Sequence, residues 1–104
     1  MGNPNSKDEL GRSQLYHAAE KKDIEKTRKL IAAGALVEDC DNYGETALHC
    51  LGWNGCKEVA ELILNAGADP TCFDLNGETP LHCSARNNTR AVAIVLCKFG
   101  ADPN

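Results

Sequence analysis

Long apolar segments are missing from this 104-residue sequence, and aromatic residues are scarce. The longest uninterrupted apolar run covers residues 91–97, whereas a helix that crosses a membrane needs about 20 such residues. Aromatic residues make up 5% of the chain, and all hydrophobic residues together make up 42%. The sequence therefore predicts no membrane span, and it predicts a core built from aliphatic side chains, alanine and cysteine.

An excess of positive charge is also missing. Eleven basic and fifteen acidic residues give a net charge of −4, which argues against general nucleic-acid binding. The charge is unevenly distributed: residues 1–37 carry seven basic and five acidic groups (+2), whereas residues 38–104 carry four and ten (−6). A partner that is basic and has apolar anchors would complement the acidic part. The other interpretation is a solvated acidic rim with no partner.

The sequence does not open with the basic and apolar segments of a secretory signal. Its six cysteines therefore fit the reduced thiols of an intracellular protein better than a secreted disulfide scaffold. No two of them have the Cys-x-x-Cys spacing. We expect an intracellular protein in the cytoplasm, with the nucleus as the other location.

A period of 33 residues runs through the chain, because the same residue types recur at that offset. Self-similarity at a fixed period of this length is typical of a solenoid of stacked units. We therefore expect a single domain over residues 1–104, with repeats at about 5–37, 38–70 and 71–104. The recurring residues are Asp8, Asp41 and Asp74; Gly11, Gly44 and Gly77; Leu15, Leu48 and Leu81; and Gly34, Gly67 and Gly100.

Each unit contains signals for two short helices. Thr46 and Thr79 are good N-caps, and Pro80 follows at the first helical position, where its missing N–H costs nothing. In the second unit we predict helices at about 47–54 and 57–65, which end near Gly55 and Gly67. Helices this short are marginal alone and need stacking. We expect Leu81 to lie in the inter-helix core, and we expect the second helices to bury Val59, Leu62, Ile63, Ala66, Val92, Val95, Leu96 and Phe99.

The residues 74–82, Asp-Leu-Asn-Gly-Glu-Thr-Pro-Leu-His, followed by Gly-Ala-Asp-Pro-Asn at 100–104, resemble the ankyrin repeat. The first unit departs from this pattern with Gln14 and Tyr16, and the second with Ala47. The resemblance implies an all-α solenoid of helix-turn-helix units with projecting β-turn or hairpin loops. It also implies that the turns and first helices line a concave face, and that the protein is a non-enzymatic interaction module.

The pairs His49-Cys50 and His82-Cys83 suggest catalysis or metal binding, but their geometry is poor. Neighbouring helical residues point about 100° apart, and equivalent residues of stacked helices lie roughly 8–10 Å apart. That distance is too long for shared zinc ligation or a disulfide. We therefore expect no catalytic residue, metal or cofactor, and a metalloprotein is our third hypothesis. The resemblance instead implies that both histidines bond the threonine caps, while the cysteines fill small core positions. Asp41 and Asp74 are predicted to be turn residues.

The positions that the repeat pattern does not require contain several large apolar residues. In the ankyrin pattern the turn tips, the end of the first helix and the last position of a unit face the groove. Trp and Tyr anchors dominate binding energy at interfaces, and a soluble monomer gains little from exposing them. The other interpretation buries Trp53, Phe73 or Leu75 as minor core. The predicted partner-binding residues are Tyr43, Glu45, Trp53, Asn54, Phe73, Leu75, Glu78 and Arg86.

An alternative function is that of a membrane-localised adaptor. The first six residues match the N-myristoylation pattern at Gly2. A second membrane signal would come from the basic residues Lys21, Lys22, Lys26, Arg28 and Lys29. Against this interpretation, residues 2–5 align in register with residues 68–71 and 101–104, so they fit the end of a repeat unit.

The two ends of the array differ in polarity. Stacked repeats need terminal units with polar outer faces. The first unit has Lys26, Thr27 and Lys29 where the later units have apolar residues, but the third unit is apolar over 91–97, and Ile94 replaces the charged Arg28 and Glu61. We therefore expect either a fragment of a longer array or self-association through the third repeat.

Overall fold

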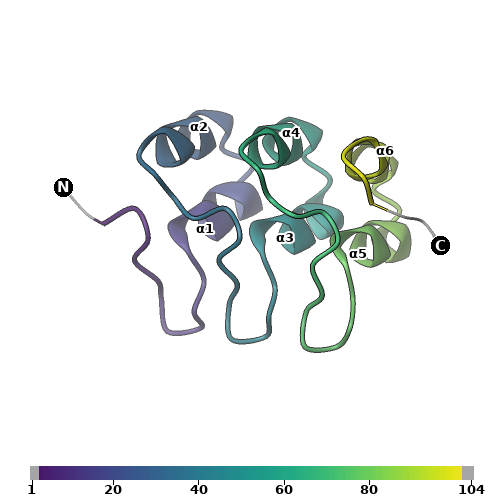
Figure 1. Cartoon of the computed structure of the whole chain (residues 1–104), viewed down its shortest axis with the longest axis horizontal. Coiled ribbons are helices and arrows are strands. Elements are labelled where there is room, and N and C mark those ends of the chain that lie inside the picture. Colours follow the sequence, from purple (N-terminus) through teal and green to yellow (C-terminus); the bar gives the residue numbers. More distant parts are fainter. Residues whose placement is uncertain (1–2, 102–104) are drawn as a thin grey trace.

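The computed structural model describes residues 3–101, which form three stacked helix pairs (Figure 1). The first helices of the pairs form one row, the second helices form another, and the turns project beyond the first row. This range holds no β-strand, only an isolated bridge between Lys7 and Ser13. The all-α prediction is confirmed, and α3 and α4 have the predicted bounds. The helices are α1 (Gln14–Glu20), α2 (Ile24–Ala32), α3 (Ala47–Asn54), α4 (Lys57–Asn65), α5 (Pro80–Asn87) and α6 (Arg90–Lys98).

The first helices of the second and third repeats, α3 and α5, begin at the predicted threonine N-caps. The backbone N–H of Thr46 donates to Nδ1 of His49 at 3.1 Å. In the third repeat the N–H of Thr79 donates to Nδ1 of His82 at 2.9 Å, and the N–H of His82 donates back to Thr79 Oγ1 at 3.3 Å. The N–H groups of Thr79 and His82, which the start of a helix would otherwise leave unpaired, thus both have acceptors. The predicted bonds between the histidines and the threonine caps are confirmed.

The turns are closed by aspartates and stacked in register. Oδ1 of Asp41 accepts the N–H groups of Tyr43 at 2.8 Å and Glu45 at 2.9 Å, and Asp74 repeats this pattern in the next turn. The two turns are joined because the N–H of Leu75 donates to the carbonyl of Tyr43 at 3.0 Å. Gly44 has a φ of 77°, and a Cβ there would lie 3.0 Å from the Leu75 nitrogen. A side chain at this position would push the turns apart.

Two further contacts hold α3 against the third repeat. The fully buried His49 donates from Nε2 to the carbonyl of Glu78 at 2.8 Å. Its Nδ1 accepts from Thr46, so the second ring nitrogen carries the proton. At Gly52 a Cβ would lie 2.7 Å from the Cβ of Cys83. Only glycine allows α3 and α5 to approach this closely.

The second helices of the repeats do not bury every residue that the sequence pattern predicts to be buried. Leu64 is buried, whereas Leu62 is half-buried and Ala66 is exposed, so the predicted burial of these two residues was wrong. The helices α2, α3 and α6 all pack on α4, and the side that they cover carries Val59, Ala60, Ile63 and Leu64. Ala66 lies at the C-cap, beyond the packed turns. Phe99 occupies the same position after α6 and is likewise exposed.

Three other burial predictions need correction. Thr27 is fully buried instead of lying on the polar outer face, and its Oγ1 donates to the carbonyl of Asp23 at 2.8 Å. Cys40 and Cys97 are exposed, although Cys50 and Cys83 are buried as predicted. Cys40 lies just before the second turn and Cys97 lies on α6, and neither is covered by another element within residues 3–101.

The last repeat leaves part of its surface uncovered. Leu48 is 1% exposed, whereas Leu81, at the same position of the third repeat, is only half-buried. Its predicted place in the core is therefore only partly correct, because no further helix pair packs on α5 and α6 within residues 3–101. Ile94 is 60% exposed. We call this surface the C-terminal face; it consists of Leu81, Ala93, Ile94 and Cys97.

This difference in cover predicts unequal costs of truncating equivalent leucines. Leu48→Ala should lower the free energy of unfolding by about 2–5 kcal/mol, because it opens a cavity between packed helices. Leu81→Ala should cost about 1–2 kcal/mol, because part of that side chain already meets water. Urea unfolding followed by circular dichroism measures both. Equal losses would show that the third repeat is covered as well as the second.

Candidate partner-binding surface

Large apolar side chains project from the turns of the second and third repeats. Tyr43 is 55% exposed and Leu75 is 78% exposed, and the backbone bond between these two residues places them on adjacent turn tips. Phe73, just before the third turn, is 67% exposed. For Phe73 and Leu75 the alternative of minor core residues is therefore wrong, because neither side chain is covered by a neighbouring turn.

Carboxylates accompany these apolar residues. Glu45 and Glu78 stand at the same repeat position, and both are half-buried. Burial raises the pKa of Glu45, and the nearby Asp41 and Asp74 raise it further. Glu78 forms an ion pair with Arg86 of α5, and its hydrogen bond raises the pKa of the Arg86 guanidinium. The structure thus places Glu45 and Glu78 beside the turns, and the ion pair connects Glu78 to Arg86 in the last turn of α5.

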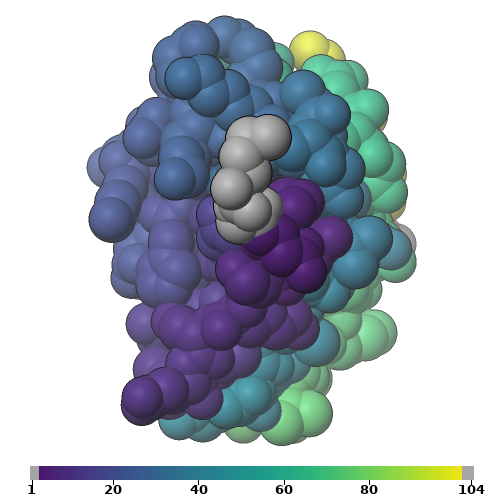
Figure 2. All heavy atoms as spheres, turned by 90° about the vertical axis from the view of Figure 1, so that its left-hand side faces the viewer, coloured from purple at the N-terminus to yellow at the C-terminus, as the bar shows by residue number. Residues whose placement is uncertain are grey.

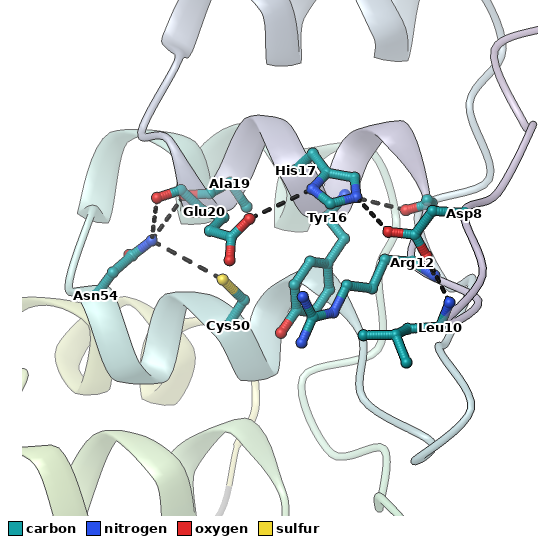
Figure 3. Close-up of polar contacts among 10 residues, drawn as sticks. Asp8, Leu10, Arg12, Tyr16, His17, Ala19, Glu20, Cys50 and Asn54 are labelled. Atoms are coloured by element: carbon teal, nitrogen blue, oxygen red, sulfur yellow. Dashed lines mark hydrogen bonds and ion pairs between the residues drawn. The ribbon is translucent and has the colours of Figure 1, made fainter.

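The first repeat reverses the charge at this position. Arg12 occurs where the later repeats have Glu45 and Glu78, and its guanidinium lies 5.3 Å from the ring centroid of Tyr16 (Figure 3). This distance is within the range of a cation–π contact. Sequence reasoning missed the stacking, although the change from Glu to Arg at one repeat position was a signal for it.

Trp53 and Asn54 lie at the far end of α3, away from the turns. About seven residues of helix separate them from the Thr46 cap, which corresponds to roughly 10 Å along the axis. Trp53 is half-buried. The Asn54 side chain donates to the carbonyl of Ala19 at 2.7 Å (Figure 3). It also accepts from the N–H of Cys56 at 3.1 Å. Because its side-chain amide already forms hydrogen bonds within the chain, Asn54 has fewer free donors and acceptors for a partner.

His17 has two acidic neighbours that sequence reasoning did not anticipate. Its Nε2 lies 2.8 Å from Oδ2 of Asp8, and its Nδ1 lies 3.3 Å from Oε1 of Glu20 (Figure 3). All three residues are at least partly exposed. The available signal was that His17 stands where the later repeats have Cys50 and Cys83. This contact ties α1 to the first turn.

The buried thiols have environments that disfavour the thiolate. Burial raises the pKa of Cys50 to about 12 and that of Cys83 to about 11. The thiolate is the form that attacks substrates and binds metals. Within residues 3–101 no three histidine, cysteine or acidic side chains are grouped so that they would hold a metal ion. None of the helices in that range has the length and apolarity of a membrane span.

The residues of the adaptor hypothesis fall partly outside the described range. Gly2, the acylation candidate, lies outside residues 3–101. The lysines that would supply the second signal are exposed in α2 and in the loop before it. Figure 2 views this N-terminal end of the stack. The exposed lysines are Lys21, Lys22, Lys26 and Lys29.

Comparison with protein families agrees with the fold. A family model described as ankyrin repeats (3 copies) matches residues 1–74, and a model of the single ankyrin repeat matches residues 76–104. Together they cover every residue of the chain except Leu75, including all six helices described above. The chain belongs to the ankyrin-repeat family.

Proposed function

We propose that this chain binds a partner polypeptide through the projecting turns and the first helices. Ankyrin repeats are in general protein–protein interaction modules. The observation that carries the proposal is the exposure of Tyr43 and Leu75 on adjacent, hydrogen-bonded turn tips. We call the proposed site the turn-tip surface; it consists of Tyr43, Glu45, Phe73, Leu75 and Glu78 at the turns, and it extends along the first helices to Trp53 and Arg86 near the ends of α3 and α5.

The rigidity of the turns supports binding. Asp41 and Asp74 each hold two backbone N–H groups of their own turn, and His49 bonds the end of the third turn. Ordering a loop at an interface costs free energy, so a preformed loop binds more tightly for the same contacts. Tyr43 and Leu75 therefore present their side chains without a large ordering cost in the backbone.

The charges favour a basic partner. Among residues 3–101 the side chain of Glu45 forms no salt bridge. Asp41 and Asp74 each have a buried Oδ2 atom without a hydrogen-bond partner among the described residues. Their charges add to the negative potential at Glu45, which the nearby Arg12 offsets in part. A lysine or arginine of the partner would be attracted to this position. The ligand is thus a basic segment with apolar anchors for the turn tips.

The adaptor function stays a prediction. Acylation of Gly2 would add the mass of a myristoyl group to the protein made in a eukaryotic host, and intact-mass measurement detects it. A pattern of a few residues matches by chance often. We therefore rank partner binding through the turn-tip surface above the adaptor function.

The anchors should dominate the affinity for such a partner. Peptides selected from a random 12-residue display library against the whole chain serve as the probe, with binding measured by calorimetry. Tyr43→Ala and Trp53→Ala should each weaken binding by about 1–4 kcal/mol, as truncation of interface anchors does. Ile94→Ala is the matched control, because Ile94 is similarly exposed but lies on the C-terminal face.

The opposite pattern would contradict the proposal. If Tyr43→Ala and Trp53→Ala bind the selected peptides as tightly as the wild type does, the turn-tip surface is not the binding site. If they lower thermal stability strongly while leaving binding unchanged, the two side chains belong to the core.

The C-terminal face is a second candidate interaction surface, and its proposed occupant is a second copy of the chain. Lys26 and Lys29 are exposed at the opposite end of the stack, so head-to-tail stacking would place lysines on Ile94 and Leu81. A two-fold pairing of C-terminal faces avoids this mismatch and buries the same apolar residues on both copies. The exposure of Ile94 supports this pairing.

Ile94→Lys should therefore suppress self-association. Arg28 and Glu61 occupy the equivalent positions of α2 and α4, so a charged residue is compatible with the helix. Sedimentation over a wide concentration range should show a monomer–dimer equilibrium for the wild type and for Ile94→Val, but a monomer for Ile94→Lys. A wild-type monomer at every concentration would rule out the pairing.

A further inference from the structure

The connection between α2 and the second turn departs from its counterpart in the second repeat. Residues 36–38 are Leu-Val-Glu, whereas residues 69–71 are Asp-Pro-Thr. Oδ1 of Asp69 accepts from the backbone N–H of Thr71 at 2.8 Å and from its hydroxyl at 2.6 Å. Leu36 cannot make these bonds, and it is 57% exposed. The first repeat therefore has an exposed aliphatic side chain at the position where the second repeat has a turn-stabilising aspartate.

Leu36 forms part of a groove of about 500 Å³. Its walls are the end of α2, the connection that follows, and the residues just after α4, so the groove belongs to the outer row of helices in Figure 1. A Cβ built at Gly67 would meet no heavy atom within 4 Å, which shows open space in front of it. We call this site the outer groove; it is lined by Ile31, Ala35, Leu36, Val37, Glu38, Asp39, Ala66 and Gly67.

The outer groove shares no residue with the turn-tip surface. Its floor and walls are aliphatic, and its two charged lining residues, Glu38 and Asp39, are both acidic. Oε1 of Glu38 accepts the N–H of Asp69 at 2.6 Å, and Asp39 lies 3.9 Å from Nζ of Lys7. Two carboxylates face one lysine, so the rim has an excess of negative charge.

We propose that the outer groove is a second docking site, which binds an extended polypeptide segment with one aliphatic residue flanked by basic residues. The aliphatic side chain packs between Leu36 and Ala66, and the flanking cations face Glu38 and Asp39. The two carboxylates repel the head groups of fatty acids and of anionic lipids. A basic peptide meets both the apolar walls and the acidic rim.

The tripeptide acetyl-Lys-Leu-Lys-amide is the probe for this site. Titrated into the full-length ¹⁵N-labelled chain, it should shift the amide signals of Leu36, Val37, Glu38 and Gly67 in a saturable way. Acetyl-Lys-Ala-Lys-amide and acetyl-Glu-Leu-Glu-amide should each bind about fivefold or more weakly, because one lacks the aliphatic anchor and the other reverses the charge.

Three variants separate local docking from a general charge effect. Leu36→Asn removes the aliphatic wall without adding charge and should weaken the probe about fivefold. Ala66→Lys places a cation at the groove and should weaken it by a similar factor. Ala33→Lys is the matched control, because Ala33 is the equivalent exposed C-cap residue of α2 but does not line the groove. Lysine is tolerated at helix C-termini, so both lysine variants should fold.

These measurements have outcomes that overturn the proposal. Absence of saturable shifts at the groove amides, or equal affinity for the lysine and glutamate tripeptides, would show that the groove takes no such ligand. Equal weakening by Ala33→Lys and Ala66→Lys would show that only net charge matters. Unchanged probe affinity in a folded Leu36→Asn variant would also refute the site. Retention of the groove shifts in Tyr43→Ala is expected, and their loss would assign the probe to the turn-tip surface.

Discussion

His49 links the start of one helix to the turn of the next repeat, and the rest of the structure depends on this link. Its ring accepts the Thr46 N–H on one side and donates to the Glu78 carbonyl on the other. A buried carbonyl that loses its donor costs about 1–3 kcal/mol. The third turn is therefore held at a fixed height relative to α3. Tyr43 and Leu75 become neighbours because of this fixed stacking.

The same dependence on neighbours explains the end of the stack. His82 also caps its helix, but no further repeat within residues 3–101 offers a carbonyl to its second nitrogen, and the residue is exposed. Gly77 shows the same effect, since a Cβ there would meet nothing within 4 Å, whereas at Gly44 it would touch the next turn. Each unit is thus completed by the unit that follows it, and within residues 3–101 no such unit packs on the C-terminal face.

Local signals were sufficient to predict most of the fold. Thr46 and Gly55 delimit α3, and Pro80 starts α5, because caps and breakers act within a few residues. Burial in the outer helices was harder to predict, since the cover of Leu64 and the exposure of Ala66 depend on packing from several other elements. The bond from Asn54 to Ala19 spans 35 residues, and nothing in the local sequence around either residue indicates it.

The exposure of some residues of the candidate site was predictable, because it depends on their position in the repeat. Tyr43 and Leu75 stand at turn-tip positions of a repeat, so their exposure follows from the period. The stacking of Arg12 on Tyr16 depends on side-chain conformations, and the outer groove depends on how two repeats meet. Leu36 differs from its counterpart Asp69 in the sequence, but the groove behind it is visible only in three dimensions.

Amide hydrogen exchange of the whole chain, with and without a saturating display-selected peptide, tests the central claim most directly. If the stacked turns form the binding surface, residues 41–45 and 73–78 should exchange more slowly in the complex, while residues 90–98 of α6 should change little. Unchanged exchange in both turns, with protection confined to other segments, would contradict the account.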